Sequence, residues 1–255
     1  MQIGNDKPVV IVAGGTGGIG NVVCKRLAGD GYQVISASRG KTVPNTKNED
    51  NIIQIACDVT SENDCHILVQ TAVDLFGRVD CMVYAVIGYY YGLPQSHSAI
   101  KIGEVFASNV FGAHLLSSAC YLHAMKKAKK GSICFIGSTV STLALPNRSA
   151  YCASKAALVG LCRALAIDWA RSGVRVNCVT TAYVATELEI NGAKNEEWGH
   201  GLDDLIQRIP LGRLANPKEI ASAVAWVISE ESSYLTGSEL IVDGGWSAFA
   251  GLGHD

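Results

Sequence analysis

The sequence predicts an α/β fold in which helices cover both faces of one parallel sheet of about seven strands. Short apolar runs, rich in β-branched residues, alternate along the chain with longer segments of helical period. A run that is apolar throughout is typical of a strand buried on both faces, and its alternation with helices indicates a doubly wound parallel sheet. The 255 residues contain no evident linker or repeat, so we expect a single domain over 1–255.

The first strand is predicted at 8–14, "PVVIVAG", because it is continuously apolar and ends in glycine. The next segment, 20–31, places Val23, Leu27 and Ala28 on one face and ends in glycine, as a helix does. The remaining apolar runs predict strands at 32–38, 52–59, 79–87, 131–137, 174–180 and 238–244.

Four further segments have helical period, at 61–77, around 98–128, 149–173 and 216–230. Ser61 and Asn216 stand where helix N-caps are expected. Residues 40–50 form a polar loop. Residues 186–209 interrupt the strand–helix rhythm, and we expect them to form a substrate lid in which Trp198 and His200 could close over the ligand.

Composition argues against several kinds of partner. The formal net charge of −2 disfavours electrostatic binding to nucleic acid or to an anionic membrane. The basic run "KKAKK" at 126–130 is interpreted as the solvated C-terminal end of a helix. No apolar run reaches about 18 residues, so no membrane span is expected. The six histidines show no metal-ligand spacing, so no metal is expected either.

The nine cysteines are scattered along the chain and include no CxxC pair. Most have apolar neighbours, so we interpret them as buried, reduced thiols in a reducing compartment. The N-terminus lacks the charged and apolar regions of a secretory signal peptide. A cytoplasmic location is therefore expected.

A glycine-rich stretch, "VVIVAGGTGGIG" at 9–20, joins the first strand to the first helix. Glycines allow a tight turn there and let the backbone approach a pyrophosphate, which then lies on the helix N-terminus. At this position in a Rossmann-like pattern the stretch predicts dinucleotide binding. The alternative is a tight turn without a ligand.

The spacing of Gly14, Gly18 and Gly20 resembles that of the short-chain dehydrogenase/reductase family, and the resemblance extends over about residues 8–246. The other family motifs follow in order: "CDVT" with Asp58, "SNVFG" with Asn109, "FIGSTVS" with Ser138, "YCASK" with Tyr151 and Lys155, "GVRVNCVTTAYVAT" with Val184 and Thr186, and a similar C-terminal third. Any one motif could arise by chance, but the ordered set at family spacing could hardly do so.

The resemblance implies roles for particular residues. The catalytic set would be Asn109, Ser138, Tyr151 and Lys155, with the backbone at Asn109 holding a water that reprotonates the site through Lys155. Asp58 would face the adenine, and Thr186 the nicotinamide carboxamide. The whole implied cofactor site is Gly14, Thr16, Gly18, Ile19, Gly20, Ser38, Arg39, Asp58, Val59, Tyr151, Lys155, Val184 and Thr186.

Three bracing positions depart from the family pattern. Ala13 stands where the family usually has threonine, and Thr181-Ala182 replaces its Pro-Gly. The N-N-A-G stretch after the fourth strand is "YAVI" at 84–87, with Gly88 one position late. That stretch steadies the sheet beside the cofactor, so the departure places the cofactor geometry in question.

The residues of "YCASK" themselves indicate acid–base chemistry. Positions i and i+4 share one face of a helix, so Tyr151 and Lys155 can converge on one point. A nearby cation favours phenolate and is expected to lower the pKa of Tyr151, which would then exchange a proton with a ketone or alcohol oxygen. Ser138 would donate a hydrogen bond to the same oxygen. Taken singly, each residue could equally serve packing, solvation or a turn.

The end of the second strand bears on the choice of cofactor. Ser38 occupies the place where a relative that prefers NAD would have an aspartate, and Arg39 follows with Lys41 beyond. Arginine can bind a phosphate with two hydrogen bonds, so we expect NADP(H) rather than NAD(H). The alternative is that Arg39 only points into solvent.

The sequence says less about the substrate. Tyr89, Tyr90 and Tyr91 follow the fourth strand at the ligand-binding edge of such sheets and could line a pocket for a flat or ring-bearing substrate. Alternatively they pack a subunit interface or a loop. His97 lies nearby and is interpreted as structural. A specialised biosynthetic ketone and a β-ketoacyl thioester both remain open.

Three functions compete at this point. The leading one is NADPH-dependent reduction of a ketone to a secondary alcohol, with Tyr151 as the general acid. The second is NAD-dependent oxidation of an alcohol or diol. The third, suggested by the altered "YAVI" stretch, is a catalytically silent cofactor-binding protein. Family resemblance also implies a homo-oligomer, a tetramer or alternatively a dimer, that pairs the helices around 98–128 and 149–171 between subunits.

Overall fold

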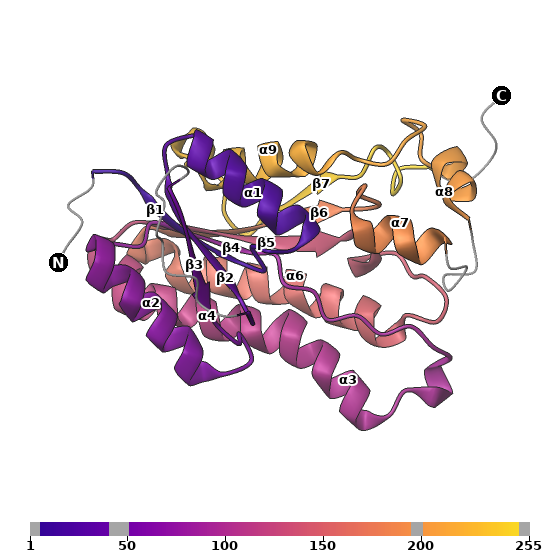
Figure 1. Ribbon diagram of the computed structural model, residues 1–255, viewed down its shortest axis with the longest axis horizontal. Coiled ribbons are helices and arrows are strands. Elements are labelled where there is room, and N and C mark those ends of the chain that lie inside the picture. Colours follow the sequence, from indigo (N-terminus) through magenta and orange to yellow (C-terminus); the bar gives the residue numbers. More distant parts are fainter. Residues whose placement is uncertain (1–5, 41–50, 195–200, 250–255) are drawn as a thin grey trace.

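The computed structural model describes residues 6–40, 51–194 and 201–249 and contains one seven-stranded sheet in the order β3-β2-β1-β4-β5-β6-β7 (Figure 1). All six strand pairs are parallel, which confirms the predicted doubly wound Rossmann-like fold. The strands are β1 Val9–Ala13, β2 Gln33–Ser38, β3 Ile52–Ala56, β4 Cys81–Tyr84, β5 Gly131–Ser138, β6 Val174–Thr181 and β7 Glu239–Val242. The strand order reverses between β1 and β4, where folds of this kind bind ligands.

Helices cover both faces of the sheet (Figure 1). Helices α1 (Gly18–Gly29) and α9 (Pro217–Ile228) lie on one face, and α2 (Glu62–Phe76), α4 (Gly112–Cys120) and α6 (Ser149–Trp169) lie on the other. Side chains alternate along β1, so Val10 and Val12 pack with α1 and α9, whereas Ile11 packs with the opposite helices. The apolar cores on the two faces of the sheet hold the strand ends, and therefore the site, in fixed positions.

The segment predicted as helical around 98–128 is helical throughout, but two π-helical turns interrupt its α-helical hydrogen bonding. It runs through α3 (Ala99–Phe106), a π-helical turn at Ala107–Phe111, α4, a second π-helical turn at Tyr121–Met125 and the short α5 (Lys126–Ala128). The first π-helical turn contains Asn109. Such turns often occur at functional sites because they redirect side chains.

Both predicted N-caps are confirmed. The Ser61 hydroxyl accepts a hydrogen bond from the Asp64 backbone N–H at 3.2 Å. Asn216 accepts from Lys218 at 2.9 Å, and the Glu219 carboxylate accepts from the Asn216 backbone N–H at 2.7 Å. Each cap satisfies donors that the first helical turn leaves unpaired, and such caps typically contribute about 1 kcal/mol.

Two helical segments are long and apolar enough to cross a membrane by length and composition alone, at Ala99–Ala128 and Ser149–Ser172. About half of each apolar window is buried inside the protein, 44% and 50% respectively. Both segments cover the sheet, and helices that form a core pass the same test. Packing inside the protein accounts for the buried half of each window.

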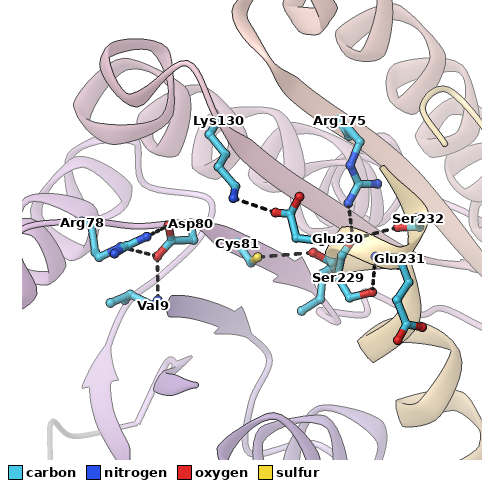
Figure 2. Close-up of polar contacts among 11 residues, drawn as sticks. Val9, Arg78, Asp80, Cys81, Lys130, Arg175, Ser229, Glu230, Glu231 and Ser232 are labelled. Atoms are coloured by element: carbon cyan, nitrogen blue, oxygen red, sulfur yellow. Dashed lines mark hydrogen bonds and ion pairs between the residues drawn. The ribbon is translucent and has the colours of Figure 1, made fainter. Parts of the chain in front are cut away.

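The edge of the sheet away from the glycine loop is tied together by polar contacts (Figure 2). The Asp80 carboxylate accepts hydrogen bonds from Arg78 and from the Val9 backbone N–H, the latter at 2.8 Å. Lys130 pairs with Glu230 at 2.8 Å across this edge. These contacts join the amino ends of the strands to the segment after α9. The glycine loop and the space for a ligand lie at the carboxyl ends of the strands.

Candidate active site

The glycine loop makes a tight turn between β1 and α1. Gly14 has a φ of 76°, and a Cβ on it would lie 2.8 Å from the backbone of Ala85, which follows β4. A Cβ on Gly20 would lie 2.1 Å from the Gly14 carbonyl oxygen. Only glycine fits at either position, and the result is a loop pressed against the point where the strand order reverses.

A large cavity of about 1220 Å³ opens beside this loop. Its walls include six of the residues predicted to bind the cofactor: Gly14, Thr16, Ser38, Arg39, Asp58 and Val59. Gly18, Ile19 and Gly20 form the adjoining start of α1. The cavity is large enough for an extended dinucleotide. Because the glycines of the loop carry no side chains, its backbone can approach a pyrophosphate that lies on the α1 N-terminus. A nicotinamide bound there would exchange a hydride with the substrate.

Asp58 presents an ionised carboxylate to this cavity. Hydrogen bonds from the backbone N–H and the hydroxyl of Thr60, at 3.0 and 2.7 Å, lower the pKa of the carboxyl, and the charge of Arg39 adds to the effect. The Thr60 contacts also fix the loop after β3. Asp58 is therefore held as an acceptor on the cavity wall.

The altered stretch after β4 is braced by a side chain from the π-helical turn. The fully buried Asn109 accepts a hydrogen bond from the Gly88 backbone N–H at 2.6 Å and donates to the Gly88 carbonyl at 2.9 Å. It also donates to the Ser154 hydroxyl at 2.8 Å. Asn109 thus joins the loop after β4 to α6, although "YAVI" matches the family's N-N-A-G at none of its four positions.

Ser138 at the end of β5 and Tyr151 in the first turn of α6 meet at one point. A hydrogen bond with Ser138 favours the ionised form of the Tyr151 phenol, but burial dominates and raises its pKa well above the ordinary value. Tyr151 is only 9% exposed. A protonated phenol beside a serine hydroxyl can donate to a carbonyl oxygen, as general-acid catalysis requires.

Lys155 occupies the same face of α6, as predicted, but its effect on Tyr151 differs from the prediction. Its Nζ donates to the Ile136 carbonyl at 2.9 Å and lies 5.8 Å from the centre of the Tyr151 ring. The expectation that the pKa of Tyr151 is lowered is corrected: burial outweighs the favourable contacts of the phenolate and raises that pKa. Burial also lowers the pKa of Lys155 to about 8.

Thr186 begins the segment predicted as a lid, and Val184 lies two residues before it. Val184 pairs with Ala215 in an isolated bridge, and the Thr186 hydroxyl accepts from the Glu189 backbone N–H at 3.4 Å at the start of α7 (Glu187–Lys194). A Cβ on Gly18 would lie 2.7 Å from the Thr186 methyl carbon. The base of the segment therefore lies against the glycine loop. Helix α8 (Leu202–Arg208) follows, whereas Trp198, His200 and Lys41 lie outside the described residues.

The three consecutive tyrosines have different surroundings. Tyr89 packs edge-on against Tyr151 with ring centres 5.1 Å apart and lines both the large cavity and a smaller one beside Tyr151. Tyr90 lines the large cavity and packs edge-on against His97 at 4.9 Å. The Tyr91 hydroxyl accepts from Asn147 at 3.1 Å, and Tyr91 is not among the residues lining either cavity. Of the three, Tyr89 is placed best to touch a substrate.

The smaller cavity, of about 80 Å³, contains residues that sequence reasoning missed. Beside Ser138 and Tyr151 its walls include Arg148, Tyr183, Glu189 and Trp246. Arg148 lies three residues before Tyr151 and Glu189 three residues after Thr186. The sequence does show a charged residue close to Tyr151 and another close to Thr186, but only the fold shows that both side chains face one cavity.

The comparisons with known proteins agree with this geometry. The sequence matches the family described as Enoyl-(Acyl carrier protein) reductase over residues 13–247. The chain belongs to the short-chain dehydrogenase/reductase family.

Individual relatives of this family member carry varied names. Glucose 1-dehydrogenase 2 of Bacillus subtilis is 30% identical, and the match covers 94% of each chain. The ligand-free structure of Thermoplasma acidophilum aldohexose dehydrogenase has a TM-score of 0.89 at 29% identity, covering 98% of this chain and 97% of that one. The structure of ElxO with NADP bound has a TM-score of 0.87 at 25% identity, covering 95% of this chain and all of that one (100%). The protein is an oxidoreductase of this family.

Proposed function

We propose that this enzyme reduces a ketone to a secondary alcohol with NADPH. The observation that carries the proposal is the convergence of Ser138 and the protonated Tyr151 on one cavity, directly beside a cavity of dinucleotide size. Ser138 would orient the carbonyl oxygen, and Tyr151 would give it a proton. Lys155 would bind the ribose of the nicotinamide nucleotide.

The preference for NADPH is proposed from the end of β2. Ser38 and the exposed Arg39 line the large cavity where a 2′-phosphate would lie, and no carboxylate stands at position 38 to repel it. The bound NADP of the ElxO structure supports this choice. Oxidation of an alcohol with NAD is the second candidate, which the dehydrogenase names of two relatives favour.

A fluorescence titration of the purified protein with NADPH and with NADH separates the candidates. We expect NADPH to bind at least about tenfold more tightly, and Arg39→Gln to remove that difference by weakening NADPH alone. Equal or tighter binding of NADH would favour the dehydrogenase. Binding of neither would mean that the departures at Ala13 and "YAVI" have disrupted the cofactor site, and a catalytically silent protein would then need a different ligand. Tyr151→Phe should bind NADPH normally and show no turnover.

We also propose that the enzyme is a cytoplasmic homo-oligomer. All nine cysteines are free thiols, and eight of them are buried, which suits a reducing compartment. Five large apolar side chains are exposed on the two helical segments that the family resemblance pairs between subunits: Ile100, Ile102, Phe111, Leu122 and Ile167. Sedimentation equilibrium should give a mass of two or four chains, and a single-chain mass would reject the oligomer.

A further inference from the structure

The small cavity beside Tyr151 contains one basic and one acidic side chain among its described lining residues, Arg148 and Glu189. All its other walls are aromatic, aliphatic or hydroxyl-bearing. Charged side chains are rarely placed in such a confined space unless a partner of matching chemistry compensates them. The pair therefore carries information about what the cavity binds.

Arg148 is held rigidly at this wall. Its side chain is buried, with 3% exposure, and its Nε donates a hydrogen bond to the Tyr89 hydroxyl. The guanidinium lies 5.9 Å from the centre of the Tyr89 ring and 5.1 Å from that of Tyr91. Because residue 148 directly precedes α6, the guanidinium and the Tyr151 phenol are fixed by the same helix start.

Glu189 reaches the cavity from α7, in the segment that follows Thr186. Burial raises the pKa of its carboxyl to about 7, and the positive charge of Arg148 acts in the opposite direction. Its negative charge also raises the pKa of Tyr151 and of Tyr89. The carboxyl therefore lies close enough to the acid group to affect it, while it belongs to another element of the fold.

The cavity of about 80 Å³ holds two or three groups of the size of a water molecule, which occupies about 30 Å³ in the liquid. A hydroxyl group can donate to a carboxylate and accept from a guanidinium, so it satisfies both charges at once. A substrate carboxylate would pair with Arg148 but meet the carboxyl group of Glu189, and an ammonium group would pair with Glu189 but meet the guanidinium of Arg148, so either ion suits only one of the two side chains. A hydrocarbon group would displace water from the cavity and offer no hydrogen bond to either side chain.

We infer that Arg148 and Glu189 select an uncharged hydroxylated substrate, an α-hydroxyketone or the corresponding vicinal diol, by binding the hydroxyl group next to the reacting carbon. This inference rests on the proposed carbonyl–alcohol chemistry at Tyr151 and narrows its substrate class. Arg148 and Glu189 are specificity-determining residues in this scheme, and the proton still moves at Tyr151.

A series of three ketones of equal carbon number tests the inference: 1-hydroxy-2-butanone, 2-butanone and 2-oxobutanoate. They differ only in the group beside the carbonyl. With the cofactor that the titration identifies, we expect kcat/KM for the hydroxyketone to exceed that of each of the others by at least about tenfold, because a hydrogen bond to a charged group is lost in 2-butanone. Equal rates with 2-butanone, or a preference for the oxo acid, would overturn the inference.

Glu189→Gln is nearly isosteric and removes the negative charge. It should raise KM for the hydroxyketone about tenfold and reduce the discrimination against 2-oxobutanoate. The control is Glu187→Gln on the same helix, where the side chain is exposed and does not line the cavity; its substrate preference should equal that of the wild type. Equal preference in Glu189→Gln would also reject the inference. If cofactor binds but neither these ketones nor their alcohols react, the proposed function itself fails and this inference fails with it.

Discussion

Lys155 lies 5.8 Å from the centre of the Tyr151 ring, near enough to share its site but with its ammonium hydrogen-bonded elsewhere. Burial therefore decides the state of the tyrosine, and the raised pKa keeps its hydroxyl protonated at neutral pH. A protonated Tyr151 is ready to serve as the acid of reduction. It must lose its proton before it can serve as the base of oxidation.

This asymmetry predicts different pH profiles for the two directions. The rate of ketone reduction should stay constant through neutral pH and fall only when alkaline pH removes the Tyr151 proton. The rate of alcohol oxidation should rise by about tenfold per pH unit across the neutral range, as expected for one ionising base. Steady-state kcat measured in both directions checks this, and an oxidation rate independent of pH would assign the base to another group.

Lys155 should reduce the stability of the folded protein at neutral pH. Its folded pKa of about 8 lies below the ordinary value of 10.5 because burial disfavours the charge. Below pH 8 the lysine is protonated in both the folded and the unfolded protein, so the folded protein bears the whole free-energy cost of burying the charge. Between the two pKa values only the unfolded state remains protonated, and the cost disappears. Lys155→Met should therefore raise the free energy of unfolding at pH 7 by roughly 1–3 kcal/mol, with no gain near pH 10.

Urea unfolding at the two pH values measures that difference. Lys155→Met also loses the hydrogen bond to the Ile136 carbonyl, which offsets about 1 kcal/mol of the gain. Lys25→Met, at an exposed position of α1, is the matched control and should show no pH-dependent gain. A Lys155→Met protein less stable than the wild type at pH 7 would contradict the assigned burial cost.

The order of elements and the spacing of the candidate catalytic residues were predictable because they depend on patterns along the chain. The apolar run of β1, the glycine spacing and the separation of Tyr151 from Lys155 can all be read along the chain. The direction of the Tyr151 pKa shift was not predictable, because it results from burial by distant segments. Arg148 and Glu189 were missed for the same reason: residues 41 positions apart face one cavity only after the sheet and α7 are in place.

Gly20 should be far less tolerant of a methyl group than Gly29, although both lie in α1. Gly20→Ala places its Cβ 2.1 Å from the Gly14 carbonyl oxygen, so the loop must move. We expect a loss of about 1–3 kcal/mol in stability and a large loss of NADPH affinity. Gly29→Ala meets no atom within 4 Å and should gain up to about 1 kcal/mol from helix propensity, with unchanged NADPH affinity. Thermal unfolding and fluorescence titration of both variants compare them directly, and similar behaviour of the two would reject the close approach.

Asn109 should contribute more to stability than Ser154, to which it donates a hydrogen bond. Asn109→Ala removes the contacts to the Gly88 backbone N–H and carbonyl and to Ser154, and it leaves part-buried polar groups without those partners. We expect the free energy of unfolding to fall by roughly 2–4 kcal/mol, since each unsatisfied buried group costs about 1–3 kcal/mol.

Ser154→Ala is the comparison variant, because it removes one contact to Asn109 and one to the Tyr151 carbonyl while the Gly88 contacts remain. It should cost no more than about 1.5 kcal/mol. NADPH affinity should fall more in Asn109→Ala, since Gly88 follows the segment that packs on the Gly14 turn. Urea unfolding and NADPH titration measure both effects. If the two variants lose equal stability and affinity, the support of "YAVI" and Gly88 comes from the surrounding packing and not from Asn109.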